Sequence, residues 1–476
     1  MSGISLGRST IILLFSRVAG YPLALLNSVI MARVLGAEAL GGYAYAVGLA
    51  ALFGLVPNLG ISTLLTRTMA RAPDGGAGMA AAAIRAQTLL AGGVVLLIPA
   101  TAALLPEQPV PIGYTVLAAL QLCLGTLSWP YLAILGGRAR YDQLAIVELA
   151  TGVTGTAAVL AAAALSGTVL AFLWAHVVAA GIAVTISRKL AAPHFPLGEN
   201  QPVRLGRLFR QAAPLGATAA VQSLYTRLDI VMLGQLASSR ALGLYSAAYK
   251  PINVVVYFGN TVAGVLLPLM AQDPRSGTPL AFTRAMRGLW AAAPGMALAI
   301  SGVAGPVLRA LFGAEFASAA PMLVVLAWSA AANWLYAPLA ISLQARDRER
   351  SWLLSLILAT IVNALGNFWA IPRWGGLGAA GVTLASEAVL LVLGTGLAWR
   401  ELAILPTGRP IVAGIAGATA GALVLFALAA LAPFAATALA LTVYLVVLVV
   451  FRTVSLEDFA TLLGWIKDAI PHRVRG

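Results

Sequence analysis

The sequence predicts an all-α polytopic membrane protein of about fourteen transmembrane helices, arranged as two pseudo-symmetric six-helix lobes and a final helix pair. Three observations predict this fold. The chain is 60% hydrophobic and only 10% charged, whereas about a quarter of the residues in soluble domains are charged. Its apolar residues are gathered in blocks of membrane-spanning length, and one sequence pattern begins twice.

The repeated pattern starts in residues 39–46, ALGGYAYA, and again in residues 241–248, ALGLYSAA, at an offset of 202 residues. The same offset aligns Asn58 with Asn260. A unit of this length is a whole bundle of helices, because solenoid repeats span only about 20–50 residues. Many secondary transporters consist of two such bundles with the substrate site between them. The repeat therefore predicts a transporter.

A transmembrane helix needs roughly 20 mostly apolar residues. Gly, Pro and charged residues separate the apolar blocks, as in PEQPVP at 106–111. The first block resembles a signal peptide, but its repeat counterpart begins near residue 212, in mid-chain, so we expect a retained helix. The predicted spans are 9–31, 41–64, 86–105, 112–135, 143–165, 168–187, 212–235, 242–268, 288–310, 321–343, 351–371, 376–398, 410–431 and 435–451.

The repeat divides the chain into three parts. Residues 1–199 form the predicted amino-terminal lobe, residues 200–400 the carboxy-terminal lobe, and residues 401–476 the last two helices with a cytoplasmic tail. Within that tail, residues 455–470 place apolar side chains at helical period, which predicts an amphipathic helix lying on the membrane surface.

The loops on one side of the predicted membrane carry more positive charge than the loops on the other side. Of the 30 Lys and Arg residues, 23 lie in the segments on the side of the termini, 4 lie on the other side and 3 lie inside spans. Cytoplasmic loops carry an excess of Lys and Arg, so we expect both termini in the cytoplasm. The cations are spread over separate segments rather than gathered in one patch, which argues against a nucleic-acid partner.

Signatures of soluble enzymes are missing from the sequence. It contains no G-x-x-x-x-G-K-[ST] motif, and its loops are too short to hold a nucleotide-binding domain. The three histidines are far apart and Cys123 is the single cysteine, which predicts no metal site, no intrachain disulfide, no cofactor and no enzymatic activity. Only His176 lies in a predicted span, where an isolated histidine is more often a packing or hydrogen-bonding residue than a ligand.

Several segments carry a resemblance to a known family. They are ARVLGAEALGGYAYA and NLGISTLLTR in the first half, and related patterns later, at 32–46, 58–67, 208–236, 241–250, 307–329 and 374–387. In this order they resemble the polysaccharide repeat-unit flippases, the O-antigen and capsule (Wzx-type) translocases. The resemblance implies the fold of the multidrug/oligosaccharidyl-lipid/polysaccharide exporters.

The resemblance also implies a function. The substrate would be an oligosaccharide on a polyprenyl diphosphate, moved from the inner to the outer leaflet of the bacterial cytoplasmic membrane by alternating access between the lobes. Such a flippase serves lipopolysaccharide or exopolysaccharide synthesis, with a polymerase and glycosyltransferases of the same pathway as possible partners.

Charged residues inside spans mark the candidate site, because a charge at the bilayer centre costs about 2.5–3.5 kcal/mol and usually faces a cavity or a partner. Three are cations: Arg17, Arg227 and Lys250. Arg offers a planar fork of donors to phosphate oxygens, so these cations are the predicted diphosphate-binding residues. For Arg17 the alternative is an extended side chain that reaches the inner membrane surface.

Three acidic residues complete the set: Asp229, Glu387 and, nearer the inner surface, Glu148. Asp229 and Glu387 are candidate ion-coupling residues. Asp229 and Lys250 lie at similar depths on neighbouring antiparallel helices, so a structural ion pair between them is the simpler expectation. For Glu387 the alternative is a protonated, hydrogen-bonded carboxyl group without a transport role.

Three other functions compete with the predicted one. A peptidoglycan-precursor flippase would also need cations around a diphosphate, and sequence chemistry barely separates it from the polysaccharide flippase. A cation-coupled multidrug antiporter would need acidic residues in its cavity, whereas the amino-terminal lobe has only Glu148 within a span. A membrane scaffold without transport activity would not need buried charges.

Overall fold

The computed structural model describes residues 3–71, 76–105, 109–195, 203–271, 280–346, 348–402, 408–428 and 432–453. Side chains within residues 3–19 are not described, which leaves the orientation of Arg17 open. The predicted amphipathic helix at 455–470 lies outside the described residues.

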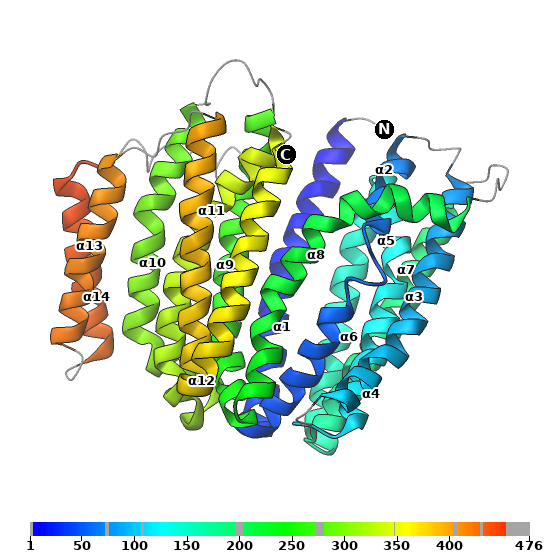
Figure 1. Ribbon diagram of the computed structural model, residues 1–476, viewed down its shortest axis with the longest axis horizontal. Helices are drawn as coiled ribbons and strands as arrows, with labels where there is room; N and C mark the ends of the chain where they lie inside the picture. Colours follow the sequence, from blue (N-terminus) through cyan, green and yellow to red (C-terminus); the bar gives the residue numbers. More distant parts are fainter. Residues whose placement is uncertain are drawn as a thin grey trace, which may run out of the picture. The chain divides into compact units, whose positions relative to one another are not determined.

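Every regular element in these ranges is a helix (Figure 1). The α-helices are α1 (Gly3–Phe53), α2 (Ile61–Arg71), α3 (Ala77–Leu104), α4 (Ile112–Leu127), α5 (Trp129–Gly137), α6 (Tyr141–Leu165), α7 (Val169–Ala191), α8 (Leu205–Leu236), α9 (Ser239–Ala271), α10 (Leu280–Phe312), α11 (Ala320–Ala345), α12 (Glu349–Leu402), α13 (Gly408–Ala427) and α14 (Pro433–Val450). Two short 3-10 helices, η1 (Ala192–His194) and η2 (Ala314–Ala319), follow α7 and α10. Ten helical segments in this part of the chain are long and apolar enough to cross a membrane, so the all-α polytopic prediction is confirmed.

Glycine makes two of the predicted breaks between spans. The first two predicted spans are joined in α1, which bends at Gly36, and the eleventh and twelfth are joined in α12, which bends at Gly375. Both glycines have a positive φ, 72° and 54°, a conformation that costs little only without a β-carbon. Each long helix therefore contains two spans that meet at a sharp corner.

One predicted span is interrupted, and another consists of two consecutive helices. The span predicted at 41–64 ends as a helix at Phe53, and the chain turns through Gly54, Pro57 and Gly60 before α2 begins. The Asn58 side chain accepts a hydrogen bond from the Ser62 amide at 3.1 Å and so caps the start of α2. The span predicted at 112–135 consists of α4 and α5, which meet at Ser128, a residue in the helical conformation, and together make one span-length segment, Ile112–Gly137.

The chain forms two compact units. The first comprises Met1–Lys250, Leu311–Phe316 and Ala364–Ala379, and the second comprises Pro251–Ala310, Ala317–Asn363 and Ala380–Gly476. The boundary between the lobes at residue 199 was predicted from the sequence repeat, and it stays a prediction.

In the first unit α1 packs on α6 and α8, and α4 and α6 pack on α7 (Figure 1). The beginning of α8 contacts α2 and α3 before the helix continues along α1. An alanine-rich core joins α2, α3, α5 and α8, with Leu65, Met69 and Leu208 fully buried in it. Small side chains allow these helices to approach closely, as is usual between membrane helices.

In the second unit α13 and α14 form a hairpin that packs on α10. The hydroxyl of Tyr444 donates a hydrogen bond of 2.6 Å to the backbone carbonyl of Ala291 in α10. In α11, the Trp334 indole N–H donates to the carbonyl of Val255 in α9 at 2.8 Å. Each of these bonds gives a partner to the polar group of a buried aromatic side chain, and so replaces the water that the group would bind at an exposed position.

Candidate functional site

Asp229 is a buried carboxylate between α8 and α9. Its side chain is 4% exposed and accepts hydrogen bonds from the Tyr245 hydroxyl and, at 2.8 Å, from the Ile230 amide. Tyr245 is fully buried. Two donors therefore stabilise this carboxylate, and the charge of Arg227 also acts on it.

The ion pair expected between Asp229 and Lys250 is not formed. Tyr245 and Lys250 are five residues apart on α9, which is about 140° of helical rotation. Because Tyr245 faces Asp229, Lys250 faces a different direction. The sequence argument matched the depths of the two residues but did not take into account which side of α9 each one occupies.

Lys250 instead belongs to a group of cationic and titratable side chains in the first unit. Its charge interacts with that of Arg227 on α8 and with His176 on α7. Arg227 and Asp229 are two residues apart and point to roughly opposite sides of α8, although the charge of Arg227 also acts on the Asp229 carboxylate. We call Arg227, Lys250 and His176 the cationic cluster.

His176 is held by two neighbours. Its Nδ1 lies 2.7 Å from the backbone carbonyl oxygen of Phe172, one turn earlier in α7. The Tyr43 hydroxyl of α1 lies 3.5 Å from each ring nitrogen, and the two ring centroids are 5.7 Å apart. Sequence reasoning missed Tyr43, although the repeat offers a signal, because Tyr43 is the counterpart of Tyr245 at the offset of 202.

The remaining candidates lie elsewhere. Arg17 is in α1, and its side chain is outside the described set. Glu148 is half-buried in α6. Glu387 is 8% exposed in α12 and belongs to the second unit. The charge of Arg227 thus acts on both Lys250 and Asp229, and Asp229 keeps its hydrogen bonds with Tyr245 and Ile230.

At one end of the first unit α1 and α9 touch through equivalent glycines of the repeat. A β-carbon on Gly41 would lie 2.6 Å from the carbonyl carbon of Ser239 and 3.0 Å from the Gly243 amide nitrogen. A β-carbon on Gly243 would lie 2.7 Å from the carbonyl carbon of Ala37 and 3.1 Å from the Gly41 amide nitrogen. The contact is reciprocal, because Ala37 and Ser239 are also equivalent at the offset of 202.

Polar contacts at the same end join α1 and α9 to the segment after α10. Glu315 forms an ion pair of 3.0 Å with Arg240 and accepts a hydrogen bond of 3.1 Å from the Ala37 amide. Arg33 donates to the carbonyl of Leu311 at 2.8 Å. The predicted topology places the corners at Gly36, Ser238 and Gly313 on one side of the membrane. Segments that contact one another must lie on the same side, so these contacts agree with the predicted topology. We call this end the closed end.

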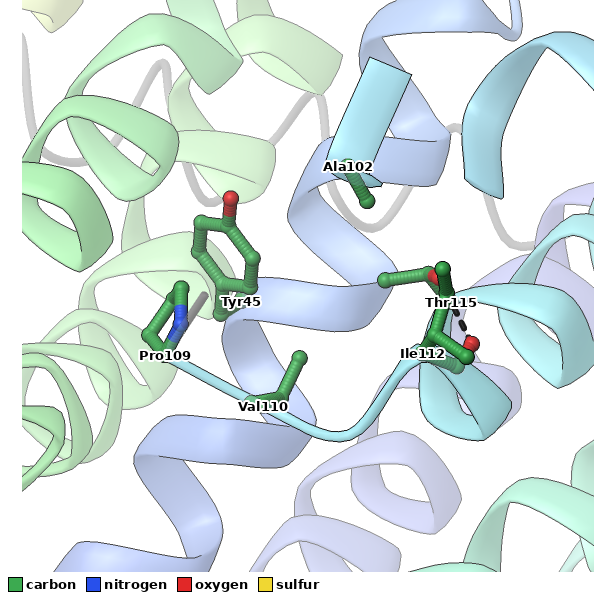
Figure 2. Close-up of a pocket in the computed structure, with 6 residues that line it drawn as sticks. All are labelled: Tyr45, Ala102, Pro109, Val110, Ile112 and Thr115. Atoms are coloured by element: carbon green, nitrogen blue, oxygen red, sulfur yellow. Dashed lines mark hydrogen bonds between the residues drawn. The ribbon is translucent and has the colours of Figure 1, made fainter. Parts of the chain in front are cut away.

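The linings of two hollows do not include the residues of the cationic cluster. Figure 2 shows one in the first unit, where the ring of Tyr45 stands beside the segment that leads into α4; its lining residues are Tyr45, Ala102, Pro109, Val110, Ile112 and Thr115. Its volume of about 10 Å³ admits about one water molecule. A second hollow, of about 700 Å³, belongs to the second unit, between the start of α13 and the end of α14, where Arg409 and Arg452 line it. Within the described ranges, no three His, Cys, Asp or Glu residues are gathered as metal ligands would be.

Comparisons with known proteins agree with the fold. The sequence profile of the family described as "Polysaccharide biosynthesis protein" matches residues 6–273. The probable low-salt glycan biosynthesis flippase Agl15 of Haloferax volcanii is 22% identical over 407 residues, which cover 82% of this chain and 83% of that protein.

Solved structures with the same fold include the lipid II flippase MurJ in an inward closed conformation. The TM-score is 0.72 at 12% identity, over 94% of this chain and 100% of MurJ. A multidrug resistance MATE family transporter of the MOP superfamily, in an inward-facing conformation, gives 0.60 at 12% identity, over 81% and 94% of the two chains. Likeness at this level of identity establishes the fold.

Proposed function

Because the chain belongs to the polysaccharide biosynthesis protein family, we propose that it flips a polyprenyl-diphosphate-linked oligosaccharide from the inner to the outer leaflet by alternating access. It is a multi-pass membrane transporter rather than an enzyme. The relative Agl15, described as a probable glycan biosynthesis flippase, supports this class of substrate.

The electrostatic interaction between Arg227 on α8 and Lys250 on α9 is the observation that carries the proposal. Like charges that interact among apolar helices repel one another, and each is costly in a membrane even alone. A diphosphate carries the opposite charge and offsets both costs. The Arg227 guanidinium can bind phosphate oxygens through two parallel N–H groups, while Lys250 acts as a point charge. Arg17 on α1 is the third proposed ligand.

The acidic residues have a different proposed role. Asp229, held by Tyr245, and Glu387 on α12 are the candidate ion-coupling residues. A buried carboxylate can exchange between a protonated and an ionised form as its surroundings change. The positive charge of the cationic cluster would repel cationic drugs, which argues against a multidrug antiporter.

The proposed location is the bacterial cytoplasmic membrane, with both termini in the cytoplasm. The excess of Lys and Arg in the loops on the side of the termini supports this orientation. The closed end would then face the outside, because Arg33 and Arg240 are in loops of the opposite set. The proposed partners are a polysaccharide polymerase and glycosyltransferases of the same pathway.

Flipping in proteoliposomes tests the function. The substrate is a fluorescent polyprenyl-diphosphate oligosaccharide, and a membrane-impermeant reductant reports how much reaches the outer leaflet. Charge-assisted hydrogen bonds contribute about 1.5–3 kcal/mol each, so Arg227→Gln and Lys250→Gln should weaken the apparent affinity roughly 10- to 100-fold. Arg17→Ala should abolish flipping, and Arg17→Lys should retain part of it. Arg85→Gln, at an exposed position on α3, is the matched control.

Two results would contradict the proposal. One is wild-type protein that moves no labelled lipid at all. The other is a set of cation variants that behave like Arg85→Gln. A competing lipid-linked peptidoglycan precursor separates the two flippase functions, because the better competitor identifies the preferred head group.

A further inference from the structure

The hollow at the end of the α13–α14 hairpin, which Arg409 and Arg452 line, has the chemistry of a lipid site. We propose that it binds the phosphate head group of an anionic phospholipid, in the membrane leaflet on the side of the termini. No residue of the proposed diphosphate site is among the described residues that line this hollow, so the inference does not rest on the flippase function.

The hollow lies where a close contact between two helices ends. A β-carbon on Gly417 of α13 would lie 2.9 Å from the Tyr444 ring of α14, and one on Gly421 would lie 3.2 Å from the carbonyl oxygen of Ala440. At the start of α13 and the end of α14, the same two helices leave an open hollow of about 700 Å³. Ligand sites have volumes of about 300–1,000 Å³, so a lipid head group can enter.

The lining of the hollow has a cationic part and an apolar part. Arg409 and Arg452 supply the cations, and neither forms an ion pair within the described part of the chain. Val412, Val450 and Phe451 supply the apolar part, and all three side chains are exposed. Among the described lining residues there is no acidic side chain. Such a lining complements a molecule that carries a phosphate next to hydrocarbon.

The backbone at Arg452 is an independent observation. Arg452 has a φ of 52°, in the left-handed region that favours glycine. Its amide donates to the carbonyl of Val449 at 2.9 Å, and the Thr453 amide donates to that of Leu448 at 3.1 Å. These two bonds are the Schellman motif that ends α14, and glycine is the usual residue at the position of Arg452. The backbone conformation disfavours arginine here, so the benefit of Arg452 lies in its side chain.

The depth of the hollow favours a lipid over a free anion. Both helices are apolar and long enough to cross a membrane. Arg409 is the second residue of α13, and Arg452 is the second residue after α14, so both cations lie at the boundary of the hydrocarbon region, where lipid phosphates lie. Basic pockets between membrane helices on the cytoplasmic side bind anionic head groups. The apolar lining would contact the first methylene groups of the acyl chains, which a free phosphate lacks.

Cross-linking from inside the hollow tests the proposal. Purified full-length protein carries the photoreactive substitution Phe451→p-benzoylphenylalanine, and dioleoyl phosphatidylglycerol is added in a non-ionic detergent. Mass spectrometry of the cross-linked protein identifies the lipid and gives its half-saturating concentration. We expect phosphatidylglycerol to saturate the site and the zwitterionic dioleoyl phosphatidylcholine to cross-link weakly. Inorganic phosphate, at matched ionic strength, should not displace the lipid.

Charge variants measure the contribution of the two arginines. Each cation near anionic lipid contributes about a fivefold gain in affinity, so Arg409→Gln/Arg452→Gln should raise the half-saturating concentration roughly 30-fold. The control Arg188→Gln/Arg350→Gln removes the same charge from exposed positions on α7 and α12 that do not line the hollow, and it should leave that concentration unchanged. A second probe, Phe426→p-benzoylphenylalanine at the other end of α13, should cross-link both lipids alike.

Arg452→Gly separates a binding role from a structural one. Glycine suits the left-handed conformation, so this variant should unfold at the same temperature as wild type or a higher one, in detergent without added lipid. It should nevertheless raise the half-saturating concentration about fivefold. A lower unfolding temperature with unchanged lipid binding would show that Arg452 only ends α14, and would overturn its role in the site.

Three results would overturn the proposal as a whole. The first is equal cross-linking of phosphatidylglycerol and phosphatidylcholine by the probe at position 451. The second is a half-saturating concentration for Arg409→Gln/Arg452→Gln equal to that of the control variant. The third is displacement of the lipid by inorganic phosphate, which would make the hollow a site for a free anion. The flippase function is tested separately by flipping, and it stands or falls independently of these results.

Discussion

Gly243→Ala is expected to open the closed end of the first unit. The β-carbon of the new alanine would overlap the carbonyl oxygen of Ala37, its nearest atom, and lie 2.7 Å from the carbonyl carbon, whereas ordinary contacts between carbon atoms are about 3.5–4.0 Å. Helices α1 and α9 must therefore move apart by more than about 1 Å. Neither atom belongs to a flexible side chain, so only a movement of the helix backbones relieves the clash.

The energetic cost follows from overpacking. Extra methyl groups forced into a packed contact cost about 1–3 kcal/mol. Each 1.4 kcal/mol is a tenfold change in an equilibrium constant, so the open population should rise roughly 5- to 150-fold. The reciprocal variant Gly41→Ala should have a similar effect. The double variant should cost less than the sum, because one separation of the helices relieves both clashes.

Thiol labelling measures the opening. Cys123 is the only cysteine, so a Cys123→Ala background with Ser246→Cys gives a single reporter. Ser246 is one turn from Gly243 in α9 and 7% exposed, so a water-soluble thiol reagent should reach it mainly in the open form. The experiment uses purified protein, to which the reagent has access from both sides.

Gly92→Ala in α3 is the matched control, because no atom lies within 4 Å of a β-carbon built there. It should leave labelling unchanged and stabilise the helix by up to about 1 kcal/mol. The reasoning is refuted if Gly243→Ala labels Ser246→Cys at the parent rate, or if Gly92→Ala accelerates labelling equally.

Two further predictions concern polar contacts of the first unit. Tyr245→Phe removes a donor from the buried Asp229 carboxylate and should lower the free energy of unfolding, measured by thermal unfolding, by about 1–3 kcal/mol. The control Tyr114→Phe should change the free energy of unfolding by less than about 0.5 kcal/mol. Equal effects of the two variants would contradict the prediction. Glu315→Gln loses the ion pair with Arg240 but keeps an acceptor for the Ala37 amide. Since exposed ion pairs contribute about 0–1 kcal/mol, Glu315→Gln should accelerate thiol labelling at Ser246→Cys less than about fivefold. An effect as large as that of Gly243→Ala would show that charge, rather than helix contact, holds this end closed.

The positions of most helices were predictable from the sequence. Membrane insertion depends on the summed hydropathy of about 20 consecutive residues, and corners depend on residues that break or bend a helix. Both properties are local, which is why the corners of α1 and α12 fall in predicted gaps. The prediction was wrong at 41–64, where hydropathy continues through Pro57 although the helix stops at Phe53, because hydropathy reports transfer into lipid and carries no information on backbone conformation.

The charged residues of the candidate site were also visible in the sequence, but their partners were not. Depth along the membrane follows from residue number, whereas direction around a helix depends on how the helices pack. Asp229 therefore contacts Tyr245 instead of Lys250, and His176, which the sequence suggested as a packing or hydrogen-bonding residue, contacts Tyr43 and the carbonyl of Phe172.

The sequence by itself determined that this chain is a repeated bundle of membrane helices with cations inside it, because composition, periodicity and repeat length are properties of the chain alone. Only the tertiary structure decided that Gly41 and Gly243, equivalent in the repeat, contact each other's helix. An internal repeat requires two halves of similar fold, but it does not specify where those halves touch. That contact depends on which surfaces are small enough for two backbones to meet.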